Sequence, residues 1–436
     1  MKLKRVTFHG GVRVPEHKEL TEDKPIEVLP EPELAIIPLS QHTGKFANPT
    51  VKPGDRVRIG TKIGELQGFI SANVHSSIAG KVVKIDEHPH PVGTTVPAVF
   101  IENDGSGETE EFTPKDWNAL SPQEIIETIK EAGIVGLGGA AFPTHVKLSP
   151  PPEKRFHSMI LNGAECEPYL TIDYRLMVEH TREILEGGAI IRKALGAKTA
   201  YIGIEDNKPE AIEQMMKLAP EYDFEVIVLR TKYPQGSEKQ LIKAITGKEV
   251  PSGGLPMDVG VYVQNVGTAY AIYEVFSKGK PLYERGVTVT GKVKEPKNLL
   301  VRIGTPVKKL IEAAGGYSEP PGKLIIGGPM MGISQYTEDI PVVKGTTGIV
   351  VQSAAEVTLP LDLPCIRCGF CVDVCPMGLV PTLVADYVRV NDIDAAEEWG
   401  IMDCMECGSC AYVCPAKRNL VHYIKLGKTI IMKRRK

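Results

Sequence analysis

The sequence predicts a multidomain protein of mixed α/β class, and three observations support this prediction. A chain of 436 residues is long enough to bury several cores and to hold roughly two to four domains. Short β-like runs and turn residues fill roughly the first 110 positions, and β-like and helical runs alternate in the middle. Eight of the nine cysteines fall between residues 365 and 414. These changes of pattern divide the chain into 1–115, 116–285, 286–352 and 353–436.

Charge and hydropathy exclude two classes of function. The net charge is -3 with acids and bases interspersed, whereas a nucleic-acid-binding protein needs a basic face or stripe. No apolar run approaches the ~18 to 20 residues that cross a bilayer. The sequence therefore predicts no nucleic-acid partner and no transmembrane segment of its own.

In the first part, the runs at 50–57 and 78–85 predict strands of a small all-β module, a β sandwich. The module resembles the lipoyl/biotinyl-type sandwich. Carrier domains of that type place a modifiable lysine in a hairpin that corresponds to residues 68–72, and no lysine occurs there. The resemblance therefore implies a structural role rather than that of a swinging arm.

The second part begins with a predicted helix over 122–130, for which Ser121 is the expected N-cap. Strands are expected at 200–204 and 225–229 and a helix at 209–218, which together indicate an α/β layer structure. In the third part, the run 287–293 and a helix over 306–314 resemble the soluble-ligand-binding β-grasp module. Apolar residues at helical spacing between 379 and 388 indicate an α-rich fourth part.

The cysteines repeat one pattern, in which three are separated from one another by two intervening residues and a fourth, followed by a proline, comes after three more intervening residues. This is a ferredoxin signature, in which the fourth thiolate typically reaches across to the other cluster. It predicts two [4Fe-4S] clusters, the first bound by Cys365, Cys368, Cys371 and Cys414, and the second by Cys375, Cys404, Cys407 and Cys410. Structural zinc is the alternative, although it usually takes two separated pairs. Disulfides are disfavoured because the run from Met1 to Val6 shows no apolar signal, which indicates the reducing cytosol.

The segment 136–144 is rich in glycine and superficially matches a dinucleotide fingerprint. That fingerprint requires a preceding strand, and a helix is expected here instead. Glycines let backbone N–H groups approach a phosphate or a flat ring, so a mononucleotide phosphate is the expected ligand. A tight turn that needs positive φ is the alternative. FMN is favoured over NAD alone, because nicotinamide delivers two electrons together whereas each cubane accepts one.

The stretch 162–169 is dense in acids. Asn162 and Glu165 are expected to bind flavin edges and Glu167 a ribose hydroxyl, and the alternative is a solvated acidic loop. Cys166 has no thiol partner near in sequence and is expected to be a packed small side chain.

With these residues in view, nearly the whole chain resembles the C subunit of the Rnf electron-transport complex. The opening run with Phe8-His9-Gly10-Gly11 and the doubled cysteine motif carry this resemblance. The central part is similar to the FMN- and NADH-binding subunit of respiratory complex I. The resemblance implies four domains: lipoyl-like (1–115), FMN/NADH-binding α/β (116–285), β-grasp (286–352) and helical dicluster ferredoxin (353–436).

The resemblance also implies site residues. FMN would be surrounded by Gly136, Gly138, Gly139, Ala140, Asn162, Glu165, Tyr233, Gly236, Asn265 and Thr268. Phe142 and Lys147 would face NAD(H), together with the catalytic candidates Glu167 and Glu238. The chain departs from the complex I relatives at Leu137, Pro150, Ala164 and Ser237.

The implied function is that of a peripheral subunit on the cytoplasmic side of the cell membrane. It would exchange hydride between NAD(H) and FMN and relay electrons through both clusters within a ferredoxin:NAD+ oxidoreductase. Expected partners are the other Rnf subunits, NAD(H) and, through the complex, ferredoxin, while membrane subunits move Na+ or H+. Two alternatives are a cobalamin reductase of a bacterial microcompartment and, given the departures at Pro150, Ala164 and Ser237, a non-catalytic cluster-bearing docking protein.

Overall fold

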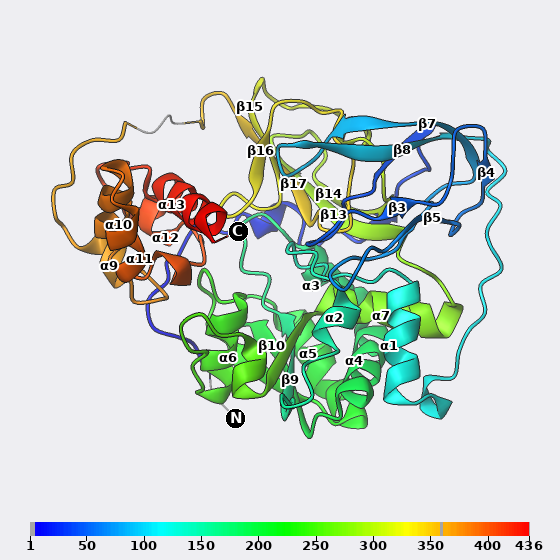
Figure 1. The fold of residues 1–436 in the computed structure, drawn as a ribbon, viewed down its shortest axis with the longest axis horizontal. Helices are drawn as coiled ribbons and strands as arrows, with labels where there is room; N and C mark the ends of the chain where they lie inside the picture. Colours follow the sequence, from blue (N-terminus) through cyan, green and yellow to red (C-terminus); the bar gives the residue numbers. More distant parts are fainter. Residues whose placement is uncertain (1–4, 358–360, 436) are drawn as a thin grey trace.

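The computed structural model describes residues 5–357 and 361–435. Residues 1–4, which begin the N-terminal run discussed above, lie outside the described part. In Figure 1 the two groups of sheets lie above the α/β part, and the C-terminal helices form a separate group at one side. Within the described ranges, no helix combines the length and the apolar character that would be needed to cross a membrane.

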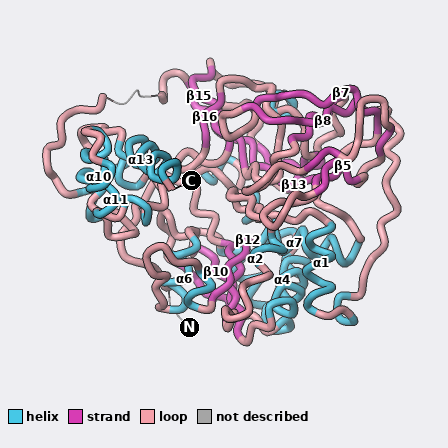
Figure 2. Tube along the Cα trace, viewed as in Figure 1, coloured by secondary structure: helices cyan, strands magenta, loops and turns pink. Residues whose placement is uncertain are grey.

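The N-terminal part consists of two small antiparallel sheets, whose strands appear at the upper right of Figure 2. One has the order β2-β8-β7-β4 and the other β3-β5-β6. Ile37, Ile63 and Ile101 are fully buried in their core. The all-β pattern is therefore confirmed. The strands are β2 (Leu34–Pro38), β3 (Asn48–Pro49), β4 (Arg56–Val57), β5 (Lys62–Glu65), β6 (Val74–His75), β7 (Gly80–Pro89) and β8 (Thr95–Asn103).

The segment before β2 joins other parts of the molecule instead of these sheets. Val6 pairs with Leu229, and Val12 pairs with Tyr233. The short strand β1 (Ile26–Val28) runs parallel to β14 (Lys297–Arg302). The N-terminal residues therefore contact both the α/β part and the third part.

The α/β part begins with α1 (Pro122–Glu131), whose predicted start is confirmed. The Ser121 side chain accepts from the Glu124 N–H, and the Glu124 carboxylate accepts from Ser121 in return, which forms a capping box. The short helix α2 (Thr144–Lys147) follows the glycine-rich segment.

Four parallel strands form the sheet of this part, in the order β11-β10-β9-β12. From β9 the chain adds β10 and β11 on one side of the sheet and then places β12 on the other side of β9. The carboxyl ends of β9 and β12 therefore form a topological switch point. Open α/β sheets bind ligands at such points. The strands are β9 (Ser158–Gly163), β10 (Thr199–Glu205), β11 (Glu225–Leu229) and β12 (Val261–Asn265), and the helices are α3 (Ile172–Glu179), α4 (Thr181–Leu195), α5 (Pro209–Leu218), α6 (Glu238–Thr246) and α7 (Val266–Lys278).

The third part is a six-stranded mixed sheet with the order β1-β14-β13-β17-β15-β16, packed against α8 (Val307–Ala313). The expected helix is confirmed, with Pro306 at its N-cap position. The remaining strands are β13 (Glu284–Gly291), β15 (Pro321–Ile326), β16 (Ile333–Gln335) and β17 (Gly348–Ser353).

One buried lysine joins three parts. The Lys344 ammonium group donates to the backbone carbonyls of Asn73 in the N-terminal part, at 2.6 Å, and of Gly133 after α1, at 2.7 Å. Burial lowers the pKa of Lys344 to about 7. Its own carbonyl accepts from the buried Arg285 guanidinium, which also donates to the Leu137 carbonyl at 3.3 Å. Arg285 of the third part thereby fixes the glycine-rich segment at Leu137.

The C-terminal part is helical, as the apolar spacing predicts. Its core contains Val384, Val388, Ile393, Ile424 and Ile431. The helices are α9 (Phe370–Asp373), α10 (Pro381–Arg389), α11 (Ile393–Glu398), α12 (Ser409–Val413) and α13 (Leu420–Arg434).

Candidate functional site

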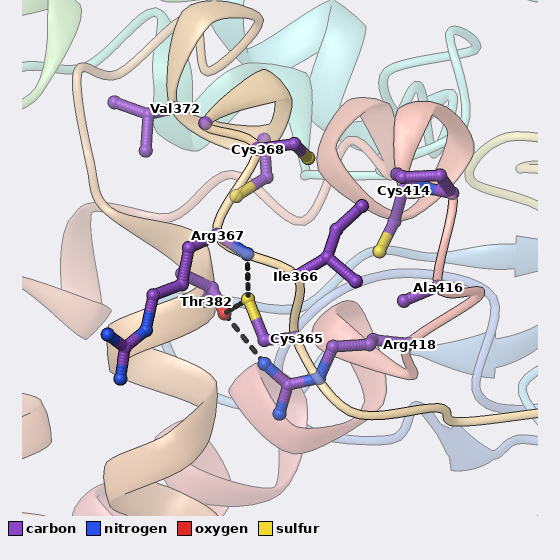
Figure 3. Close-up of a pocket in the computed structure, with 12 residues that line it drawn as sticks. Cys365, Ile366, Arg367, Cys368, Val372, Thr382, Cys414, Ala416 and Arg418 are labelled. Carbon is purple, nitrogen blue, oxygen red and sulfur yellow. Dashed lines mark hydrogen bonds between the residues drawn. The ribbon is translucent and has the colours of Figure 1, made fainter.

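The first cysteine group surrounds a cavity of about 200 Å³ in the C-terminal part (Figure 3). Three thiols come from one cysteine run and the fourth, Cys414, comes from the other. The Cys365 sulfur accepts from the Arg367 N–H at 3.4 Å and from the Thr382 hydroxyl at 3.5 Å. These hydrogen bonds, that of Thr382 above all, lower the pKa of the Cys365 thiol. A thiolate at this position is therefore stabilised by its surroundings.

The second group surrounds a tighter pocket, again with three cysteines from one run and one from the other: Cys404, Cys407, Cys410 and Cys375. The Glu406 N–H donates to the Cys404 sulfur at 3.4 Å, and the Leu379 N–H donates to the Cys375 sulfur at 3.4 Å. Burial raises the pKa of Cys404 to about 11. The cysteines of this pocket are less exposed than Cys365 and Cys368 of the first.

The backbone repeats between the two groups. Arg367 and Glu406, which occupy the same place in the two motifs, have φ of 56° and 60°, and the glycines two residues later have φ of 83° and 80°. This repeated turn directs an N–H toward the first sulfur of each group.

The donor sets fit iron–sulfur clusters, because each is all-thiol, accepts N–H···S bonds and encloses a cavity. Across the described ranges, no three His, Cys, Asp or Glu side chains lie close enough to share a single metal ion. None of the nine cysteines is paired in a disulfide.

A second group of predicted residues meets at the switch point. Asn265 ends β12 and caps α7, since its side-chain oxygen accepts from the Thr268 N–H at 3.2 Å. The Thr268 hydroxyl accepts from the Leu137 N–H at 2.9 Å, which fixes the glycine-rich segment beside the helix start. A methyl group on Gly138 would lie 3.4 Å from Asn265.

The glycine-rich segment offers free donors to an anion. Gly138, Gly139 and Ala140 are exposed, and their N–H groups donate to no acceptor among the described residues. Gly139 has φ of 108°, which favours glycine, and open space lies in front of it. Together with the N-terminus of the 13-residue helix α7, these donors fit the phosphate of a mononucleotide such as FMN.

Two predicted acids are engaged by backbone groups. The Glu165 carboxylate accepts from the N–H groups of Asp173, at 2.7 Å, and Tyr174, at 3.2 Å, and so caps the start of α3. The Glu167 carboxylate accepts from Met330 and Met331 in the loop between β15 and β16. Burial raises the pKa of Glu167 to about 7. Glu167 therefore links the α/β part to the third part.

Two of the four residues expected to face NAD(H), Lys147 and Glu238, meet beside β12. The Lys147 ammonium group donates to the Glu238 carboxylate and to the Val263 carbonyl, at 2.6 Å. Phe142 is half-buried two residues before α2. The structure thus brings Lys147 and Glu238 together, whereas the Glu167 carboxylate is turned to Met330 and Met331.

Tyr233 and Gly236 lie between the switch point and the second cysteine group. The Asn162 side-chain amide donates to the Gly236 carbonyl at 2.8 Å, and the Gly236 N–H donates to the Cys166 sulfur at 3.2 Å. Tyr233 is buried and packs in one cluster with Cys407. Within the described ranges, its buried hydroxyl has no hydrogen-bond partner.

Comparison with known families accounts for most of the chain. Four family models match: the RnfC barrel sandwich hybrid domain (6–106), the Nuo51 FMN-binding domain (129–274), the SLBB domain (287–334) and the 4Fe-4S dicluster domain (363–418). The C subunit of the proton-translocating ferredoxin:NAD(+) oxidoreductase complex of Clostridium ljungdahlii is 50% identical, over 96% of this chain and 93% of that protein. The C subunit of the Na(+)-translocating complex of Acetobacterium woodii is 48% identical over the full length of both.

The chain belongs to the RnfC family. A further RnfC relative, the C subunit of the ion-translocating oxidoreductase complex of Rhodobacter capsulatus, is 43% identical over 92% of this chain and 78% of that protein. The fold also resembles that of an NAD+-reducing [NiFe]-hydrogenase in the H2-reduced state, with a TM-score of 0.51 and 18% identity over 72% of this chain and 63% of that chain. That likeness concerns the fold alone.

Sequence reasoning missed two charged residues of this RnfC-family site. The Asp173 carboxylate accepts from the Asn265 amide at 2.6 Å, and burial, followed by the nearby Glu165 charge, raises its pKa to about 7. The Arg285 guanidinium is buried against Leu137. A charged residue at a helix start or a strand start is common, so neither position carried a distinctive local signal.

Proposed function

We propose that this chain is the nicotinamide-handling subunit of an ion-translocating ferredoxin:NAD+ oxidoreductase. It exchanges hydride between NAD(H) and FMN and relays single electrons through two [4Fe-4S] clusters to partner subunits, while membrane subunits of the complex move Na+ or H+. The relatives from C. ljungdahlii and A. woodii, both subunits of ferredoxin:NAD(+) oxidoreductases, support this proposal over a cobalamin reductase or a non-catalytic docking protein.

The proposal assigns the residues as follows. The N–H groups of the glycine-rich segment and the start of α7 hold the FMN phosphate, and Asn162, Tyr233 and Gly236 line the ring. FMN supplies, when bound, the conversion between a two-electron donor and one-electron acceptors. Lys147 and Glu238 orient the nicotinamide nucleotide beside Phe142. The two crosswise cysteine groups hold the clusters.

One observation carries the order of electron transfer: the second cysteine group, and not the first, packs against the flavin side of the α/β part. Tyr233 packs with Cys407, and the Ser237 hydroxyl lies 3.6 Å from the Met405 sulfur. The Gln240 amide donates to the Pro376 carbonyl at 3.0 Å. The cluster of Cys375, Cys404, Cys407 and Cys410 therefore receives electrons from FMN, and the exposed first cluster exchanges them with a partner.

The finer architecture also belongs to the proposal. The N-terminal sheets form a lipoyl-like sandwich and the six-stranded sheet a β-grasp module, both of which serve as docking surfaces within the complex. The domain limits are 1–115, 116–285, 286–352 and 353–436. The subunit is bound peripherally on the cytoplasmic side of the membrane.

An anaerobic NADH titration followed by visible and EPR spectra tests this function. Protein reconstituted with iron, sulfide and FMN is expected to show cluster reduction, and protein without FMN is not. A Cys368→Ser variant should retain NADH-dependent reduction of the second cluster, whereas Cys407→Ser should prevent reduction of the first. NADH-dependent reduction of the first cluster at the wild-type rate in Cys407→Ser would contradict the proposed order.

A further inference from the structure

A cavity of about 520 Å³ lies at the carboxyl ends of β10 and β11. These strands lie on the opposite side of β9 from the switch point, because β9 separates β10 from β12 in the sheet. Gly138, Asn265 and Thr268, which mark the proposed phosphate end of the flavin site, do not line this cavity, whereas Tyr233, which is proposed to line the flavin ring, does. The cavity therefore adjoins the ring end of the proposed flavin site and lies apart from its phosphate end.

The N-terminal segment forms one wall of the cavity. The Val6 N–H donates to the Val228 carbonyl at 3.1 Å, and the Arg230 N–H donates to the Val6 carbonyl at 2.9 Å. Farther along, Val12 and Tyr233 exchange two backbone hydrogen bonds, at 2.7 and 2.9 Å. These pairs bring the side chains of the segment against those that follow β11.

The floor of the cavity is saturated by its own contacts. The buried Lys18 ammonium group donates to three backbone carbonyls, those of Glu165, Glu167 and Leu170. Glu205, also buried, forms an ion pair with Lys208 at 3.4 Å. The floor therefore has little capacity left to bind a ligand.

The rim is different, because its cations outnumber its acids. Of the two rim acids, Glu16 accepts a hydrogen bond from the Asn207 amide at 2.7 Å and Asp206 forms an ion pair. Arg5 pairs with Asp206 at 3.1 Å. Arg13 and Arg230 are exposed and form no ion pair with any carboxylate in the described ranges. Burial lowers the pKa of Lys232 to about 8, and the positive charges of Arg230 and Arg13 contribute to that shift. The three cations are thus close enough to repel one another, and an anion between them would remove that repulsion.

We propose that this cavity binds a phosphate-bearing anion, held between the guanidinium groups of Arg13 and Arg230. A planar guanidinium group can donate two parallel hydrogen bonds to phosphate oxygens. A doubly charged phosphate also neutralises two unpaired cations better than a single carboxylate does. The volume of the cavity lies in the range of small-molecule sites and accommodates a ligand of mononucleotide size. The proposed anion site is distinct from the FMN phosphate site, because none of the residues assigned to that phosphate lines the cavity.

Titration calorimetry with pyrophosphate tests it, on the full chain with its clusters reconstituted and with FMN present at saturation, so that the flavin phosphate site is filled. Saturable binding is expected with wild type. Arg13→Ala and Arg230→Ala should each weaken binding by about tenfold or more, since each removes a charge-assisted hydrogen bond. Arg182→Ala, which removes an exposed arginine of the same part on α4, should leave binding unchanged.

A second arm identifies the source of the phosphate. Sedimentation with phosphatidylglycerol vesicles, compared with phosphatidylcholine vesicles, reports binding to a lipid headgroup. Binding of pyrophosphate alone supports a free phosphate ligand, and Arg13-dependent binding of vesicles alone supports a headgroup. Binding of neither probe, or binding that both arginine variants leave unchanged, overturns the proposal.

Discussion

The side-chain amide of Asn265 donates a 2.6 Å hydrogen bond to the carboxylate of Asp173. Asn265 comes from the end of β12 and Asp173 from the first turn of α3, so this bond ties two helix starts together at the switch point. Burial and the Glu165 charge raise the pKa of Asp173 to about 7, although the hydrogen bond from Asn265 and the Arg285 charge oppose this shift.

This raised pKa predicts a pH dependence of stability. In the unfolded chain Asp173 loses its proton near its ordinary pKa of 3.8, and in the folded protein near 7. Between these values the unfolded state binds fewer protons, so the contribution of Asp173 to stability falls as the pH rises from about 4 to about 7 and is constant above that. Asp173→Asn removes this contribution while keeping an acceptor for Asn265.

Thermal unfolding midpoints of wild type and Asp173→Asn, measured from pH 4 to 8, test the prediction. The difference between them should shift in favour of the variant as the pH rises toward 7. An Asp206→Asn variant serves as a control, because the pKa of Asp206 is lowered, so its contribution to stability changes only below about pH 4 and its difference from wild type should stay constant over this range. A constant difference between wild type and Asp173→Asn would show that Asp173 ionises normally.

Two glycine substitutions should separate folding from flavin binding. A methyl group on Gly187 in α4 would collide with the Ala269 carbonyl of α7, so Gly187→Ala should destabilise the protein by about 1–3 kcal/mol. Gly138→Ala places a methyl group 3.4 Å from the Cβ of Asn265, which is an ordinary van der Waals contact. It should preserve the unfolding midpoint and narrow the phosphate site, with FMN affinity reduced about tenfold. Fluorescence titration with FMN measures this, and unchanged affinity argues against the assigned site.

Loss of one crosswise cysteine should remove one cluster. Wild type reconstituted without oxygen is expected to carry about eight irons, and Cys414→Ser about four. Cys166→Ser is the matched control, since Cys166 lies outside both groups and a serine oxygen can still accept from the Gly236 N–H. Iron and sulfide analysis checks both variants. A drop in the Cys166→Ser variant would indicate that this thiol is a ligand.

Glu167 should hold the loop between β15 and β16. An amide at this position cannot accept two N–H bonds through both of its terminal atoms, so Glu167→Gln is expected to accelerate hydrogen exchange at Met330 and Met331. Glu319→Gln, an exposed substitution in the same part, should leave that exchange unchanged. Equal exchange in all three proteins would mean that the carboxylate does not restrain the loop.

Features governed by neighbouring residues were predictable from the sequence. The start of α1 follows from Ser121 and Glu124, which satisfy each other within one turn. Two cysteine runs with the ferredoxin spacing suggested a crosswise grouping, and the structure gathers each set around its own pocket.

Features that depend on distant parts of the chain were not predictable. Local patterns assign the first 28 residues to the N-terminal module, yet Val6 and β1 pair with strands of two other parts. The acidic loop suggested that Glu167 faces a nucleotide. Its carboxylate instead accepts hydrogen bonds from the backbone N–H groups of Met330 and Met331, which are 163 and 164 positions away in the sequence. Such partners are set by how the domains pack, and sequence spacing carries no record of that packing.

The unequal exposure of the two cysteine groups has a consequence for handling the protein in air. Cys365 and Cys368 are open to solvent, whereas Cys407 and Cys410 are buried. Dioxygen therefore reaches one cofactor long before the other, and brown colour should bleach in two phases. Briefly aerated protein would retain the second cluster and its reduction by NADH, but it would lose the first cluster, which passes electrons to partner proteins.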